Sequence, residues 1–114
     1  MFGGEMGEKS AEDRAVVQHI NARLDAEIAD FTPQTRSDHA NLAAFCKARV
    51  APRLVTVNFS GGLTQKCWNI TRSNGTYRVV YLPSAGYFSL CVESDFGPLD
   101  IGVHGGAINC FSSV

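Results

Sequence analysis

The apolar residues of the segment 10–30 recur at spacings of three and four, which is the period of an amphipathic helix. Ser10 is placed to cap the first turn, and Asp13 follows it at the spacing of a capping box. Thr32-Pro33 ends this helix, because a proline inside it would remove a hydrogen-bond donor. The apolar stripe of the predicted helix consists of Val17, Ile20, Leu24 and Ile28.

A second helix is predicted to start at Thr32-Pro33, with Thr32 as the N-cap, and to run to about Val50 before Pro52 stops it. Alanines separate the apolar residues of this segment, which favours both helix formation and close packing. A short connection then predicts a tight helical hairpin. The apolar stripe of the second helix consists of Leu42, Phe45, Cys46 and Val50.

After Pro52 the apolar period changes from 3.6 to 2, which predicts strands. Asn74-Gly75 favours a two-residue hairpin turn and places Trp68 opposite Tyr81. The pair Gly105-Gly106 predicts a last hairpin in the same way. About six strands are expected, at 53–60, 66–73, 76–82, 87–94, 99–104 and 107–111.

This register gives the sheet one apolar face, and the two helices must cover it because no other segment can. We therefore expect a single α+β domain over 10–114, preceded by a flexible tail over 1–9. Two N-terminal helices would pack on one face of a curved antiparallel meander, which resembles cystatin-like and nuclear-transport-factor-like folds in shape alone. The apolar face carries Trp68, Ile70, Tyr77, Val79, Tyr81 and Phe88, and the opposite face carries Cys67, Asn69, Thr71 and Arg78.

The composition is that of a folded domain, with 114 residues, 45% of them apolar and 18% charged. No segment has the roughly 18 consecutive apolar residues of a membrane span, and the first residues lack a basic segment followed by an apolar one. We expect a soluble cytoplasmic protein, or a periplasmic or secreted one if a signal peptide was removed. A net charge of −1 argues against a nucleic-acid partner.

The charges are unevenly distributed along the chain. Residues 1–31 hold seven acids and three bases, whereas residues 32–82 hold seven bases and only one acid, Asp38. Either the two segments lie together and their fields largely cancel, or a basic face is exposed. In the second case Lys66, Arg72 and Arg78, on or beside the central hairpin, would meet an acidic partner.

The four cysteines form no Cys-x-x-Cys pair, so no zinc site is predicted, and the sequence points to no metal or other cofactor. Cys46 and Cys110 are expected to face the interior as buried thiols or as a bonded pair. Cys67 and Cys91 share the opposite face but lie two strands apart, too far for a disulfide. The disulfide state is left open.

No catalytic constellation stands out, so the sequence favours a protein that is not an enzyme. One alternative stays open: an acid–base pair formed in space from Asp38 or His39 with Asp100 or His104.

We expect a small non-catalytic binding or regulatory module of the inhibitor, immunity or accessory-subunit type, acting through its sheet face or loops. Its partner is expected to be another protein, with self-assembly into a homo-oligomer as a further option and no role for a membrane. The alternative is an apolar-ligand-binding protein or a simple cone-type isomerase-like enzyme. Its pocket would be lined by Trp68, Tyr77, Tyr81 and Phe88.

Overall fold

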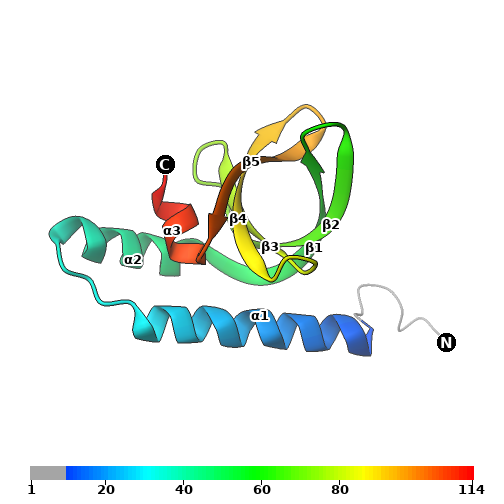
Figure 1. Ribbon diagram of the computed structural model, residues 1–114. Helices are drawn as coiled ribbons and strands as arrows, with labels where there is room; N and C mark the ends of the chain where they lie inside the picture. The colour runs from blue at the N-terminus through cyan, green and yellow to red at the C-terminus, as the bar shows by residue number, and fades with distance from the viewer. Residues whose placement is uncertain (1–9) are drawn as a thin grey trace.

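The computed structural model describes residues 10–114 (Figure 1), so the tail predicted over 1–9 lies outside the described residues. The chain is α+β, as predicted, with two helices followed by a sheet. A third, short helix comes last. The elements in chain order are α1 (Ala11–Asp30), α2 (Arg36–Ala48), β1 (Arg49–Phe59), β2 (Leu63–Thr71), β3 (Tyr77–Leu82), β4 (Tyr87–Ser94), β5 (Gly97–Gly105) and α3 (Ala107–Ser112).

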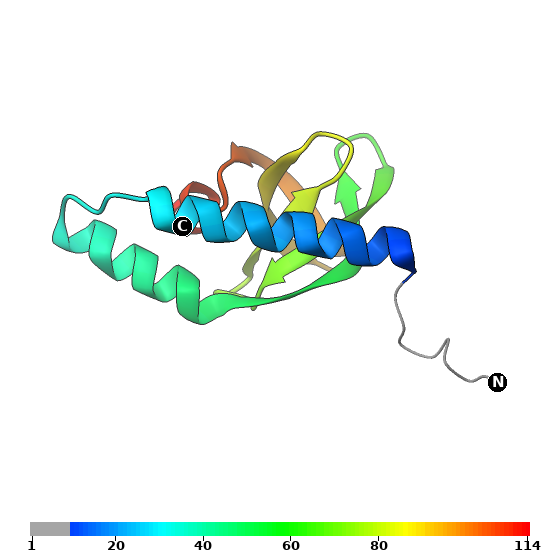
Figure 2. The same cartoon turned by 90° about the horizontal axis from the view of Figure 1, so that it is seen from below.

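The sheet is a closed barrel in the order β1-β2-β3-β4-β5, not the open curved meander of about six strands that the sequence predicted. Neighbours along the chain pair antiparallel, and a parallel contact between Asn58 of β1 and Leu99 of β5 closes the ring. Both long helices lie on one side of this barrel, with α1 running along it and α2 beside α1 (Figures 1 and 2). Among the described residues, no helix has the length and apolarity needed to cross a bilayer.

The predicted last hairpin is wrong, because residues 107–111 belong to α3 and not to a sixth strand. Gly106 is the N-cap of α3, and the Glu27 carboxylate of α1 accepts hydrogen bonds from the amides of Ala107 (2.9 Å) and Ile108 (2.7 Å). A carboxylate at the positive end of a helix stabilises it. This capping group comes from the other end of the chain, so the local pattern around the glycines could not reveal it.

Helix α1 begins as predicted, since Ser10 caps it and accepts a hydrogen bond of 3.0 Å from the Asp13 amide. Helix α2 begins three residues later than predicted, because its N-cap is Thr35 and not Thr32. Thr35 and Asp38 form a capping box, in which the Asp38 amide donates to the Thr35 hydroxyl (3.0 Å) and the Asp38 carboxylate accepts from the Thr35 amide (3.2 Å). These reciprocal bonds outweigh the signal of Thr32-Pro33.

Strand β1 follows α2 directly and therefore starts earlier than predicted. Pro52 lies inside this strand and is buried, at an irregularity in the pairing with β2 between Arg49 and Arg53. Proline is tolerated in a strand where the ladder is interrupted. Here it marks such an interruption and not the boundary between helix and sheet.

The register of the central hairpin is confirmed, with Trp68 paired with Tyr81. The turn itself differs from the prediction: Asn74 pairs with Tyr77, so the two turn residues are Gly75 and Thr76. Gly75 has a φ of +66°, a conformation that glycine adopts without strain. Arg72 and Ser73 lie outside both strands, and the change of register between the Asn74–Tyr77 pair and the Trp68–Tyr81 pair occurs in this segment.

The sheet carries a core on each of its faces. The outer core lies between the barrel and the helices and includes Ile20, Leu24, Phe45 and the aromatic residues of the central strands. The face that was expected to be the opposite, more polar one is the inside of the barrel. It holds a second core of buried residues, which are Val57, Cys67, Val80, Leu82 and Cys91.

Candidate partner-binding groove

The four aromatic residues predicted to line a ligand pocket lie in the outer core. Trp68, Tyr81 and Phe88 are buried there, and Tyr77 packs against them. The Arg23 guanidinium of α1 lies over the rings of Tyr81 (5.6 Å) and Phe88 (5.3 Å) and donates a hydrogen bond to the Gly86 carbonyl oxygen. Tyr81 and Phe88 therefore pack against α1, and none of the four aromatic residues lines either of the two pockets described below.

The structure does not bring the three predicted partner-binding cations together. Arg78 pairs with Cys91 across the sheet, on the face that lines the barrel, and forms an ion pair with Glu93. Lys66 is exposed on β2, two residues from Trp68 and therefore on the outer face. Arg72 follows the end of β2 and lines a groove, to which neither Lys66 nor Arg78 contributes.

This groove lies between the C-terminal half of α2, the segment 72–74 and the last helix. It has a volume of about 290 Å³. The Arg72 amide donates a hydrogen bond of 2.8 Å to the Ala48 carbonyl oxygen, which ties the end of β2 to the end of α2. Its lining residues are Ala44, Lys47, Ala48, Arg72, Ser73, Asn74 and Phe111.

The floor of the groove is apolar and its rim is basic. Phe111 is buried and packs edge-to-face on Phe45 at 5.6 Å, so the floor is fixed by the outer core. Lys47 and Arg72 are exposed and form no ion pair within residues 10–114. The groove therefore combines uncompensated positive charge with an apolar surface.

The charge segregation of the sequence is only partly neutralised in the fold. Arg49 joins the acidic first helix to the basic middle segment through an ion pair of 2.8 Å with Asp25. Asp38, the single acid of the middle segment, is occupied in the capping box of α2. Hydrogen bonds from the Gln34 and Thr35 amides hold the pKa of its carboxyl below the ordinary 3.8. Neither carboxylate lines the groove.

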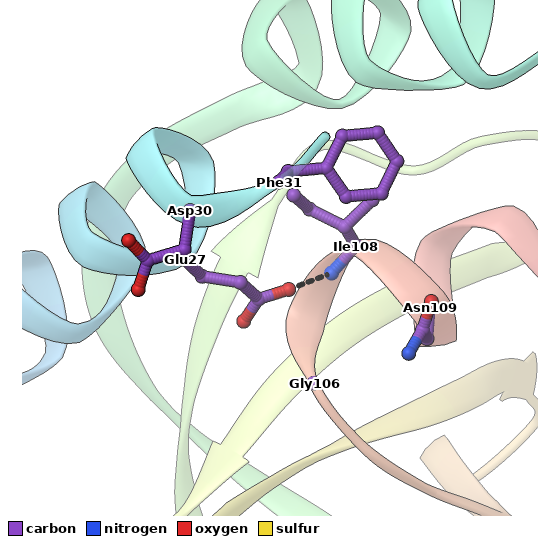
Figure 3. Close-up of a pocket in the computed structure, with 6 residues that line it drawn as sticks. All are labelled: Glu27, Asp30, Phe31, Gly106, Ile108 and Asn109. Carbon is purple, nitrogen blue, oxygen red and sulfur yellow. Dashed lines mark hydrogen bonds between the residues drawn. The ribbon is translucent and has the colours of Figure 1, made fainter. Parts of the chain in front are cut away.

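A second pocket, of about 350 Å³, lies between the end of α1 and the start of α3 (Figure 3). Its acidic groups are Glu27 and Asp30. The Glu27 side chain points to α3, where both of its oxygens accept hydrogen bonds from backbone amides. Because that carboxylate already caps a helix, this pocket is the weaker candidate for a binding site.

The acid–base pair that the sequence left open is not formed within residues 10–114, because Asp38 caps α2 and Asp100 contacts His104 instead, in a cluster between β4 and β5. Asp100 accepts hydrogen bonds from the Ser89 hydroxyl and from Nε2 of His104 (3.1 Å), and Tyr87 stacks on the His104 ring at 4.8 Å. The carboxylate lies between the serine and the imidazole, whereas a nucleophilic serine needs the imidazole itself as its base. The cluster fits a structural link between two strands better than a nucleophile–base pair.

The cysteines are four free thiols, so the pairing of Cys46 with Cys110 is not formed, and Cys46 is exposed rather than buried. Burial raises the pKa of Cys91 to about 12 and that of Cys67 and Cys110 to about 11. A thiol with so high a pKa is a poor nucleophile at neutral pH. Among residues 10–114, no three His, Cys, Asp or Glu side chains are grouped so that they could hold a metal ion.

A scan against protein-family models, a search of curated proteins and a search of solved structures each found no match to this chain. Sequence reasoning identified Arg72 but missed Lys47 and Phe111. Lys47 fits the usual place of a cation in the last turn of a helix, and Phe111 was assigned to a strand. No local signal therefore indicated that these two residues lie together with Arg72.

Proposed function

We propose that this protein is a non-catalytic binding module of the inhibitor, immunity or accessory-subunit type. Its groove between α2, residues 72–74 and Phe111 would receive an acidic segment of a partner protein, in which a carboxylate lies next to an apolar side chain. The observation that carries the proposal is the pair of unpaired cations, Lys47 and Arg72, at the rim of an apolar floor.

The two parts of the groove have different tasks in this proposal. The apolar floor would supply most of the affinity, because buried apolar anchors dominate binding energy at protein interfaces. The exposed cations would steer an acidic segment into place and select against basic ones, which is the usual effect of charges at an interface rim. The Arg72 guanidinium can also bind a carboxylate through two parallel hydrogen bonds.

The size of the groove fits one side chain with its neighbouring peptide groups. An apolar cavity of roughly 150 Å³ accommodates benzene, and the groove is about twice as large. Ser73 and Asn74 add hydrogen-bonding groups beside the apolar floor. A short peptide segment therefore suits the site better than a folded surface or a long nucleic-acid backbone.

The test uses fluorescent, capped peptides in which one phenylalanine or leucine is flanked by glutamates, with lysine-flanked peptides of the same length for comparison. We expect the acidic peptides to bind and the basic ones not to bind. In the double variant Lys47→Glu, Arg72→Glu, the affinity for acidic peptides should fall by at least about tenfold. The readout is fluorescence anisotropy at low and at high salt.

The matched control is Lys66→Glu, which reverses an exposed cation on β2, away from the groove lining. It should leave binding unchanged, and circular dichroism should show that all variants keep their fold. Arg72→Glu alone changes the net charge by as much as Lys66→Glu does. Equal losses of affinity in these two single variants would mean that only net charge matters, and the proposal would fail. It would also fail if lysine-flanked peptides bound as tightly as the acidic ones.

A further inference from the structure

Phe96 is the most exposed large apolar side chain that the structure describes, with 88% of its surface accessible. It lies in the connection between β4 and β5, at the top of the barrel in Figure 1. Asp95 precedes it, is also exposed, and forms no ion pair within residues 10–114. The tip thus presents a carboxylate next to an aromatic ring, which is the chemistry that the groove is built to receive.

The backbone of this tip is held in one conformation by side-chain hydrogen bonds. The Ser94 hydroxyl donates to the Gly97 carbonyl oxygen (2.6 Å) and accepts from the Phe96 amide (3.2 Å). Asn58 of β1 donates to the carbonyl oxygens of Phe96 (2.9 Å) and Pro98 (3.3 Å). A segment that is ordered before it binds loses less conformational entropy on binding. The Phe96 side chain is therefore exposed on a segment whose backbone is already ordered for binding.

We infer that the groove of one copy of this chain binds the Asp95-Phe96 tip of a second copy. This inference rests on the proposed function, because it uses the same groove and names an occupant for it. The phenyl ring of Phe96 would lie on the floor formed by Ala44, Ala48 and Phe111. The Asp95 carboxylate would pair with Lys47 and Arg72 at the rim.

The contact must be made between two chains. The tip lies at the top of the barrel, whereas α2 and α3, which border the groove, lie on its lower left side (Figure 1). Phe96 is not among the residues that line the groove of its own chain. The tip and the groove are different surfaces. In a pair, one copy therefore keeps its groove free and the other keeps its tip free. Further copies can then add head to tail, unless the assembly closes into a ring.

One tip in one groove buries much less than the roughly 1,200–2,000 Å² of a stable protein interface. The association is therefore weak and depends on concentration. It competes with any partner segment for the same groove, so a high local concentration of the protein would limit partner capture.

The first experiment measures the self-association of the full chain by sedimentation equilibrium over a range of concentrations. The parent protein should associate, and Phe96→Ser should weaken association by at least about tenfold. The matched control is Leu63→Ser, which removes an apolar side chain that is 69% exposed on β2. This control should associate like the parent. A loss of equal size in both variants would overturn the inference, since any exposed apolar residue would then serve.

The second experiment is a charge exchange. Asp95→Arg alone and the double variant Lys47→Glu, Arg72→Glu alone should each fail to associate, because like charges meet at the contact. Mixing the two variants should restore association, because the altered tip then meets the altered groove and the two natural surfaces meet each other. Absence of association in the mixture would overturn the inference.

The two proposals fail separately. The inference is overturned if the parent chain stays monomeric at millimolar concentration. The proposed function is then still tested separately, by whether glutamate-flanked peptides bind the groove. The inference is also overturned if neither Phe96→Ser nor the double variant Lys47→Glu, Arg72→Glu weakens self-association, because another surface must then be responsible. A synthetic peptide of residues 94–98 should compete with labelled acidic peptides for the groove of the Phe96→Ser variant, whose own tip no longer occupies it. Failure to compete counts against the inference alone.

Discussion

The carboxylate of Glu27 accepts a hydrogen bond of 2.7 Å from the backbone amide of Ile108, and this contact joins α1 to the start of α3 (Figure 3). The other carboxylate oxygen accepts from the Ala107 amide. The first amides of a helix have no partner within the helix itself. Glu27 therefore stabilises the start of α3 against α1, and through this helix it helps to position Phe111 in the groove.

Replacing Glu27 by alanine should lower the free energy of unfolding by roughly 1–3 kcal/mol, because two partly buried amides lose their acceptor. Glu27→Gln keeps one acceptor oxygen and should cost less. Urea denaturation followed by circular dichroism measures both. Asp30→Ala, an exposed carboxylate that lines the same pocket, is the control and should be nearly neutral. Equal losses for Glu27→Ala and Asp30→Ala would contradict the capping role.

The capping box of α2 predicts a pH dependence. The hydrogen bond from the Gln34 backbone amide is the largest cause of the lowered pKa of Asp38. The Asp38 carboxylate of the folded protein therefore binds a proton less readily than that of the unfolded chain. The contribution of Asp38 to stability is complete above the ordinary value of 3.8 and is lost as the pH falls through the lowered one. The parent should therefore exceed Asp38→Asn in stability at pH 6, and the difference should shrink below about pH 4. A difference independent of pH would show that the charge of Asp38 is not involved.

The thiols should differ sharply in reactivity. Cys46 is exposed, whereas burial raises the pKa of the other three. A thiol reagent at pH 8 should therefore modify one cysteine of the folded protein quickly and the remaining three only after unfolding. Mass spectrometry of the labelled peptides identifies the site, and Cys46→Ser should abolish the fast reaction. Rapid labelling of Cys67 or Cys91 would mean that the barrel interior opens readily.

The contact of Ser89 with Asp100 should be visible as an energetic coupling between β4 and β5. Ser89 is fully buried, so Asp100→Ala would leave its hydroxyl without this acceptor and lower the free energy of unfolding by about 1–3 kcal/mol. In the double variant Ser89→Ala, Asp100→Ala the loss should be smaller than the sum of the single losses. Additive losses in this double-mutant cycle would show that the two groups do not interact.

The features of the fold that depend on local signals could be predicted from the sequence. The spacing of apolar residues and the Ser10 cap were enough for α1. The turn signal of Asn74-Gly75 placed Trp68 opposite Tyr81, although the turn residues in the structure are Gly75 and Thr76. Closure of the barrel depends on contacts between distant strands, and no local pattern shows it. One signal was present, since Val80, Leu82 and Cys91 make the second face of the sheet apolar as well. Strands with two apolar faces indicate burial on both sides.

The groove was predictable only in part, for the same reason. Arg72 drew attention because of its charge, whereas Lys47 and Phe111 join it through the packing of α2 and α3. Arg78 has the same charge as Arg72, but its ion pair with Glu93 depends on the pairing of β3 with β4. A count of charges along the chain cannot distinguish a free cation from a paired one, because that difference arises in three dimensions.

The parallel contact of Asn58 with Leu99 also bears on how the protein is made. Helices α1 and α2 and strands β1 to β4 all precede β5 in the chain. The ring cannot close until β5 has emerged, so until then the side chains of its future interior stay open to water and to other chains. A nascent chain is therefore expected to expose these side chains to misassembly until β5 has left the ribosome.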